Sequence, residues 1–197
     1  ERVGLVGPQE ASLGESVALM RRLRAAYGLS GGDKGNPARE LAERLKGKTP
    51  LIWGSALGTA SIAFRWKTQL LENSKVWAAS GELPEMTHNE VMGWQRGARS
   101  PGRSFFGVFL ADRGDHPRVK RRMRMTGRLL APLLAGCATI RSKGRSPLAR
   151  LFSLTYLGDW VSFYLALLNG VDPTPVAPIE TIKAMMKGRP KQEVRLG

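Results

Sequence analysis

Four short apolar runs, separated by helical stretches, most constrain the fold of this chain. The runs are Leu51–Trp53, Val76–Ala79, Ser104–Leu110 and Ala138–Arg141. Between them, apolar residues recur every three or four positions, which is the spacing of one helix face. Strands that alternate with helices are typical of a parallel sheet covered on both sides. The sequence therefore predicts an α/β protein: a three-layer α-β-α sandwich with a mostly parallel sheet.

The helical stretches have recognisable ends. Asn36 before Pro37 suits a helix start, and Gly47 suits the end of the same helix. In the stretch 117–134, apolar residues follow one face and six basic residues take the others, which favours a solvated basic face on a helix that packs against the sheet. We expect helices at about 8–26, 37–47, 60–71, 117–134, 147–168 and 175–187.

Length and cysteine content narrow the class of protein. A chain of 197 residues suits one domain or one and a half. Its single Cys137 excludes an intramolecular disulfide framework and fits a reducing compartment, so we expect a cytoplasmic protein. The sequence has no run of about 18 apolar residues, the length that a membrane span needs. Glu1 opens the chain without an initiator Met or a signal-peptide pattern, so we expect a processed chain or part of a longer one.

The net charge of +15 predicts attraction to anions. Nucleic acid, acidic membrane and phosphorylated substrates all remain open on charge alone. Nucleic-acid proteins often interleave aromatic residues with basic ones, so that bases can stack on them. Here the aromatic residues after the second basic cluster, Phe152, Tyr156 and Trp160, have the four-residue spacing of a buried helix face. Nucleic-acid binding is therefore a weaker hypothesis that rests on charge alone.

Carboxylates and a histidine gather in the middle of the chain. Glu72 and the segment 81–90 supply four glutamates and His88. Such side chains can divide the work of base and acid in proton transfer near neutral pH. Glutamates around a proline are also common at helix starts, and a lone histidine is more often structural. The residue types alone leave both interpretations open.

Four segments in order carry a resemblance to a known family. They are Asn36–Ala42, Arg65–Lys75, Glu82–Trp94 and Leu165–Val176. Together they resemble the C-terminal half of the bifunctional phosphoglucose/phosphomannose isomerases, in the sugar isomerase (SIS-domain) superfamily. The resemblance divides the chain into an N-terminal helix and linker at 1–35, leading from a first SIS domain outside this chain, a C-terminal SIS-type isomerase domain at 36–187, and a basic tail at 188–197.

The resemblance implies a fold, an activity and an assembly. The fold would be a five-stranded parallel sheet between helices. The activity would interconvert glucose 6-phosphate or mannose 6-phosphate with fructose 6-phosphate, with neither metal nor organic cofactor. The assembly would be a homodimer whose active site is shared between the subunits, with no membrane partner.

The resemblance also implies roles for individual residues. Glu72 would move the proton between C1 and C2 of the sugar, and His88, reaching over from the other subunit, would assist ring opening. Lys183 would face the substrate and stabilise the developing oxyanion. Thr174 would accept the mannose epimer. Trp66 or Trp77 could shield the glutamate from water.

Departures from the family pattern keep alternatives open. Leu71 replaces a polar residue before the glutamate, and Trp77 replaces a proline. The family's phosphate-gripping loop belongs to the first domain. Ser55 and Thr59, beside two glycines, resemble such a phosphate cradle, although a structural turn is the competing interpretation. The alternative function is a non-catalytic SIS module that binds sugar phosphates.

Overall fold

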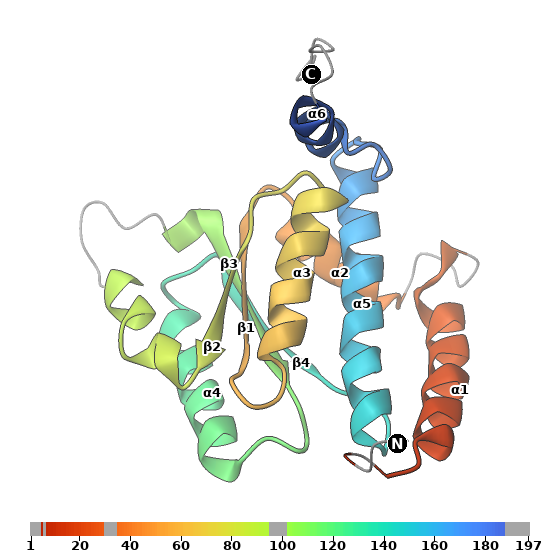
Figure 1. Ribbon diagram of the computed structural model, residues 1–197. Helices are drawn as coiled ribbons and strands as arrows, with labels where there is room; N and C mark the ends of the chain where they lie inside the picture. Colours follow the sequence, from red (N-terminus) through yellow and green to blue (C-terminus); the bar gives the residue numbers. More distant parts are fainter. Residues whose placement is uncertain (1–4, 6, 30–34, 95–101, 188–197) are drawn as a thin grey trace.

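A computed structural model describes residues 5, 7–29, 35–94 and 102–187 (Figure 1). The predicted basic tail 188–197 lies outside these residues. The helices are α1 (Glu10–Tyr27), α2 (Pro37–Leu45), α3 (Ala60–Glu72), α4 (Pro117–Leu130), α5 (Pro147–Leu168) and α6 (Ala177–Met186). The strands are β1 (Thr49–Ser55), β2 (Ala79–Leu83), β3 (Phe105–Ala111) and β4 (Gly136–Arg141), with 3-10 turns η2 (Glu85–Thr87), η3 (Glu90–Trp94) and η4 (Gly102–Ser104).

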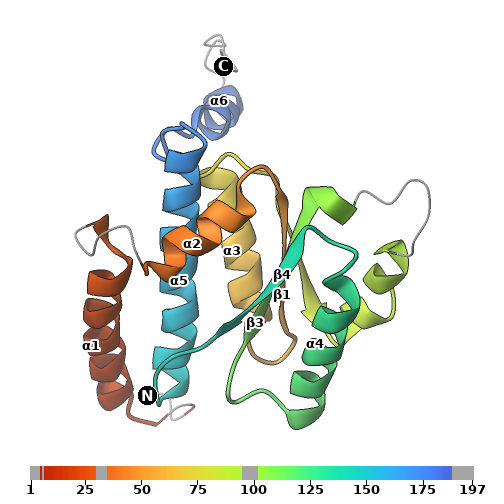
Figure 2. The same cartoon turned by 180° about the vertical axis from the view of Figure 1, so that it is seen from behind.

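The strands form one parallel sheet in the order β2-β1-β3-β4. Helices α3 and α5 cover one face and α4 covers the other, with α1 outside α5 (Figures 1 and 2). This arrangement confirms the predicted α/β three-layer sandwich. The resemblance implied five strands, whereas the described residues form four. In this order the chain reverses direction across the sheet between β1 and β3, where ligands commonly bind in open α/β sheets.

The second strand lies later in the chain than predicted. The apolar run Val76–Ala79 is mainly a loop, and β2 pairs with β1 from Ala79 to Leu83. The amide of Val76 donates to the carbonyl of Leu70, so this loop folds back onto the end of α3. Val76 and Ala78 nevertheless pack into the core, which explains why they carry an apolar signal without being a strand.

Helix α4 also ends earlier than the predicted boundary at Leu134. The amides of Leu133 and Leu134 both donate to the carbonyl of Leu130, which forms a tight final turn. Pro132 has no amide hydrogen to continue a helix. Leu130 and Leu134 remain fully buried, so the apolar periodicity continues past the helix end.

Both faces of the sheet are buried. Ile52 and Val108 point into the core with α2, α3 and α5, whereas Trp53 and Phe109 point into the core under α4. The Trp53 and Phe109 rings lie 4.9 Å apart between centroids. Alternating side chains that are buried on both faces explain why these runs are continuously apolar.

Helix α5 lies at the centre of the core on the face of the sheet that α2 and α3 also cover. It packs against α1, α2 and α3, and its apolar length and composition meet the requirement for crossing a membrane, which the sequence analysis did not anticipate. Half of that apolar window is buried within the protein, and Asp159 on this helix pairs with Arg65 of α3. The packing is that of a core helix.

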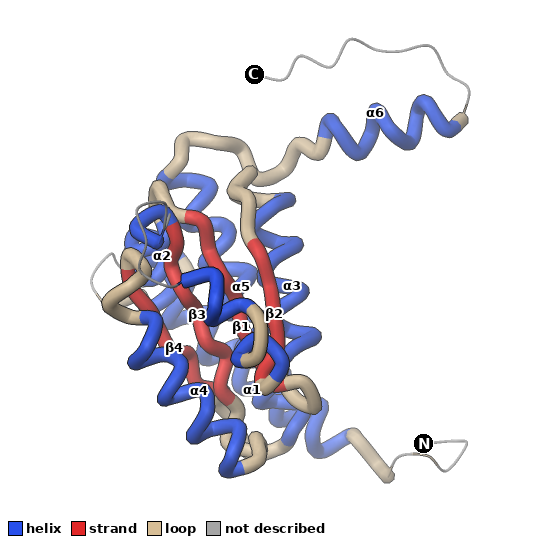
Figure 3. The backbone as a smooth tube through the Cα atoms, turned by 90° about the vertical axis from the view of Figure 1, so that its left-hand side faces the viewer, coloured by secondary structure: helices blue, strands red, loops and turns tan. Residues whose placement is uncertain are grey.

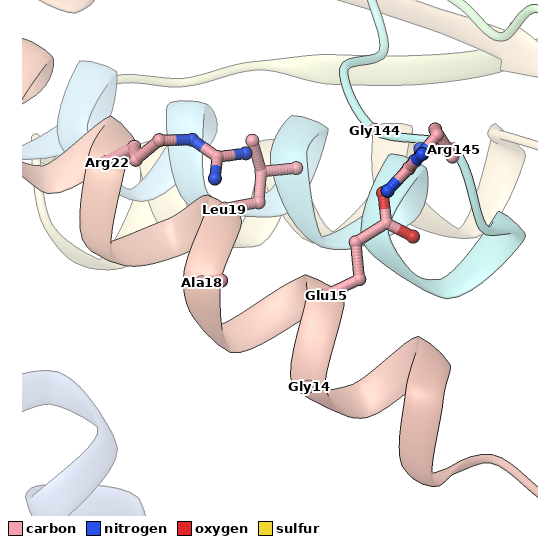
Figure 4. A pocket seen from close by; sticks show the side chains of 7 residues that line it. All are labelled: Gly14, Glu15, Ala18, Leu19, Arg22, Gly144 and Arg145. Carbon is pink, nitrogen blue, oxygen red and sulfur yellow. The ribbon is translucent and has the colours of Figure 1, made fainter.

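Glu15 fixes α1 to the start of α5. Its carboxylate accepts hydrogen bonds from the backbone amides of Arg145 (2.6 Å) and Ser146 (2.9 Å), and Ser146 is the N-cap of α5. Figure 4 shows the Glu15 carboxylate pointing towards Arg145, and both residues line a cavity of about 690 Å³ between α1 and this loop. These amide hydrogen bonds lower the pKa of Glu15 from 4.5 to about 2. Leu19 and Leu23 of the same helix enter the core, so α1 packs as part of this domain.

We expect Glu15 to stabilise the fold in a pH-dependent way. Because its pKa is lower in the folded protein, its contribution is complete above the unfolded value of 4.5 and is lost as the pH falls towards about 2. Urea unfolding of the wild type and Glu15→Gln should therefore show a stability difference at pH 7 that narrows below about pH 5. A difference that stays constant from pH 7 to pH 3 would contradict this role. Glu10→Gln on the same helix is the control.

Candidate functional site

Glu72 lies at the edge of the sheet where the strands begin. Helix α3 connects the end of β1 to the start of the parallel strand β2, so it runs opposite to both strands and its last residue lies at their amino-terminal edge. Glu72 is that last residue, and its side chain is exposed. The structure thus has the carboxylate at a helix end, as the sequence predicts.

Lys75 joins the end of α3 to the loop between α5 and α6. Its ammonium donates to the carbonyls of Glu72 (2.6 Å) and Pro175 (2.7 Å) and lies 3.5 Å from that of Pro173. Lys75 adopts a left-handed backbone with φ 55°, the conformation that usually selects glycine just after a helix. Strained positions of this kind concentrate at functional sites. Lys75 therefore brings together two segments about 100 residues apart.

That second segment carries Thr174. Its backbone amide donates to Asp172 at 2.8 Å, and this bond, with the Thr174 hydroxyl, lowers the pKa of the Asp172 carboxyl. Thr174 is exposed, as is Lys183 farther along on α6. Helix α6 begins beside the ends of α3 and α5 and extends away from the sheet (Figures 1 and 3). Glu72, Thr174 and Lys183 therefore belong to the same end of the molecule.

His88 lies at the opposite edge. It follows η2, which comes directly after the carboxyl end of β2, and it is exposed. Five residues of β2 alone span roughly 15 Å. Within one chain, Glu72 and His88 thus lie at opposite edges of the sheet, so they cannot share a hydrogen-bonded site there.

Ser55 is the last residue of β1 and Thr59 directly precedes α3, so both also lie at the carboxyl edge. Both are buried, and their hydroxyls donate to protein oxygens: Ser55 to Asp115 at 2.5 Å, and Thr59 to the carbonyl of Leu110 at 2.7 Å. The Ser55 hydroxyl also accepts from the Thr59 amide. This geometry favours the structural turn, and the phosphate-binding role of the two residues stays a prediction.

The cavity at this edge, between β1 and β3, holds about 620 Å³. Asp112 and Asp115 both line it. Asp115 accepts the Asp112 amide at 2.7 Å, and Asp112 pairs with Arg150. Asp115 accepts hydrogen bonds from neutral donors, the Ser55 hydroxyl and the Asp112 amide, and its carboxylate at the wall disfavours a phosphate there. No three His, Cys, Asp or Glu side chains gather as a metal site within the described ranges.

The predicted shielding of Glu72 by tryptophan is not seen. Trp66 is fully buried, and its indole donates to the carbonyl of Leu154 in α5 at 2.9 Å. Trp77 is 65% exposed. Shielding of Glu72 from water requires contacts beyond those that the described residues make.

The sequence analysis missed two residues of this site. Lys75 carries no sequence signal for a left-handed turn, which glycine would have given. Asp172 does carry a sequence signal. An Asp two residues before a Thr, with a proline between them, favours a turn that the Asp side chain caps.

The four-stranded parallel sheet with helices on both faces defines the class of α/β three-layer folds. Residues 34–186 match the family model for the bacterial phospho-glucose isomerase C-terminal SIS domain. The chain belongs to this family.

Two curated relatives, both named bifunctional phosphoglucose/phosphomannose isomerase, have substantial identity. The protein of Caldicellulosiruptor bescii is 40% identical over 92% of this chain and 53% of its own length. That of Aquifex aeolicus is 43% identical over 76% of this chain and 46% of its own length. This chain thus spans about half the length of these relatives.

A solved structure has the same fold. A glucose-6-phosphate isomerase like protein from Thermus thermophilus superimposes with a TM-score of 0.70 at 22% identity, over 88% of this chain and 56% of that one. At this identity the likeness concerns the fold alone.

Proposed function

We propose that this chain is the C-terminal half of an aldose–ketose isomerase that converts glucose 6-phosphate or mannose 6-phosphate to fructose 6-phosphate. Membership of the family supports this proposal. The observation that carries it is the Lys75 bridge, which joins the Glu72 end of α3 to the loop of Thr174. The bridge connects segments to which the resemblance independently assigns catalytic and substrate-binding roles.

The proposed chemistry follows from the residue types. Ring opening needs a group that can give and take a proton near neutral pH, which suits His88. Glu72 then removes the C2 proton and returns it to C1 through an enediol. Lys183, an exposed cation on α6, stabilises the oxyanion that develops during this transfer. None of these steps needs a metal or an organic cofactor.

The placement of Glu72 and His88 supports a shared active site. Because they lie at opposite edges of one chain, a site that uses both needs a second subunit. We propose a homodimer in which His88 of each chain approaches Glu72 of its partner. We also propose a cytoplasmic location, which the single half-buried cysteine suits.

Heterodimers of two inactive variants test this proposal. Full-length Glu72→Gln and His88→Ala chains, each with a different affinity tag, are coexpressed, and the doubly tagged dimer is isolated. If the site is shared, one of its two sites contains both native residues, so turnover should be about half of the wild-type value. Each parent homodimer should stay near background.

Three results would separate the alternatives. Heterodimer turnover at background would mean that both residues act from the same chain. A doubly tagged species that cannot be isolated, while each variant sediments as a monomer, would remove the dimer. A wild-type protein that binds glucose 6-phosphate without turnover would instead support the non-catalytic module.

A further inference from the structure

A small cavity lies between α4 and the sheet edge at the carboxyl ends of β3 and β4. It holds about 290 Å³ and is separate from the cavity between β1 and β3. Its walls come from the segment after β3, the end of β4 and one side of α4. The charged and hydroxyl side chains among them are Asp112, Arg113, Lys120, Arg124, Arg141, Thr139 and Ser142.

The alternation along β4 places two of these side chains. Ala138 and Ile140 pack into the core with α5, so Thr139 and Arg141 point to the opposite face, where α4 lies. Lys120 and Arg124 lie one helical turn apart and line the same cavity from α4. Residues from the strand and the helix thus converge from two sides.

Four cations line this cavity without acidic partners. Within the described residues, Arg113, Lys120, Arg124 and Arg141 form no ion pair. The Lys120 ammonium donates to the carbonyl of Arg113 at 2.6 Å, which holds it at the rim with two hydrogens left to donate.

The one carboxylate in the wall is already neutralised. Both carboxylate oxygens of Asp112 accept from Arg150 Nε, at 2.9 and 3.1 Å. The carboxylate also accepts from the Ser142 hydroxyl and from the Gly114 amide, the latter at 2.7 Å. The four remaining cations therefore leave the cavity with an uncompensated positive charge.

We propose that this cavity is a binding site for a compact phosphate-bearing anion, such as the phosphate group of a phosphorylated metabolite. The guanidinium groups of Arg124 and Arg141 and the ammonium of Lys120 supply charge-assisted donors, and the Thr139 hydroxyl adds a neutral one. The site lies beside β4 at the carboxyl edge of the sheet, opposite Glu72 and three strands across the sheet from β2, which leads to His88. It is therefore additional to the active site proposed above and does not depend on it.

A second row of cations on the same helix provides a matched control. Arg118, Arg121 and Arg122 lie on the side of α4 that faces η3 and line a more open groove with Met125 and Leu129, which are 59% and 57% exposed. Removing two of these arginines changes the net charge as much as removing Arg124 and Arg141. It leaves the cavity between α4 and β4 intact.

The test is a titration of this chain with inorganic phosphate, followed by amide chemical shifts and calorimetry, with sodium chloride holding ionic strength constant. We expect saturable shifts at Thr139 and Ser142, with half-saturation below about 10 mM. Arg124→Gln/Arg141→Gln should weaken binding by roughly 10- to 100-fold, and Arg118→Gln/Arg121→Gln by less than about threefold.

Each other outcome overturns the proposal. Equal weakening in the two double variants would mean a diffuse electrostatic effect of the basic helix. Shifts confined to the groove of Arg118 and Arg121, or no saturation at about 10-fold higher phosphate, would show that the cavity does not hold the anion.

Glucose 6-phosphate as a second titrant then determines whether the sugar adds affinity to its phosphate. Circular dichroism checks that both variants remain folded.

Discussion

Replacing Glu72 by glutamine should remove most isomerase turnover from the full-length protein while sugar-phosphate binding persists. Glutamine keeps the shape of the side chain but cannot take up the C2 proton. Loss of a positioned general base typically lowers the rate by about 10²–10⁴-fold. A coupled assay in both directions and fructose 6-phosphate binding by calorimetry measure the two quantities separately.

Glu43→Gln is the matched control for this substitution. Glu43 is an exposed glutamate on α2, ion-paired with Arg39 at 3.1 Å and remote from the end of α3 in sequence. The turnover of the Glu43→Gln variant should remain at the wild-type level. If Glu72→Gln keeps near wild-type turnover, or still exchanges the C2 proton with solvent deuterium, Glu72 is not the base.

Replacing Trp66 by alanine should destabilise the domain by about 3–5 kcal/mol, a large share of the typical stability of a domain. The ring is 1% exposed and lies against Gly158, where an added Cβ would come within 2.3 Å of the indole nitrogen. Alanine would leave a cavity at this contact between α3 and α5 and leave the Leu154 carbonyl without its indole donor. Urea unfolding followed by circular dichroism gives the change in free energy.

Trp77→Ala provides the comparison, because the same change at a 65% exposed ring leaves no cavity. It should change the stability of this chain by less than about 0.5 kcal/mol. Equal losses in the two variants would contradict the assignment of Trp66 as a core contact and Trp77 as a surface residue.

Local patterns predicted the class of fold and most of its elements. The runs at β1, β3 and β4 were recognisable because strands buried on both faces are continuously apolar. Asn36 before Pro37 marked the start of α2, and its side chain does accept the amides of Ala38 and Arg39. Strand β2 was misplaced because Gly81 and Glu82 carry no apolar signal. Their strand conformation depends on pairing with Trp53 and Gly54 of β1.

The candidate site was likewise predictable from the sequence only in part. Resemblance singled out Glu72, His88, Thr174 and Lys183, and the helical periodicity predicted that Glu72 ends a helix. The sequence could not predict that Lys75 contacts the Thr174 loop, or that His88 lies at the other edge of the sheet. Both depend on how α3 and α5 pack on the sheet. The partners of Ser55 and Thr59 likewise come from β3 and the segment after it.

The sequence by itself determined the alternation of strands and helices, since each element's apolar period records which of its faces is buried. Only the tertiary structure decided which residues meet. Arg124 of α4 and Arg141 of β4 line one cavity because β4 turns alternate side chains towards the helix, whereas Glu72 and His88 are held apart by the length of a strand. Distances between elements follow from sheet order and packing, which no local pattern encodes.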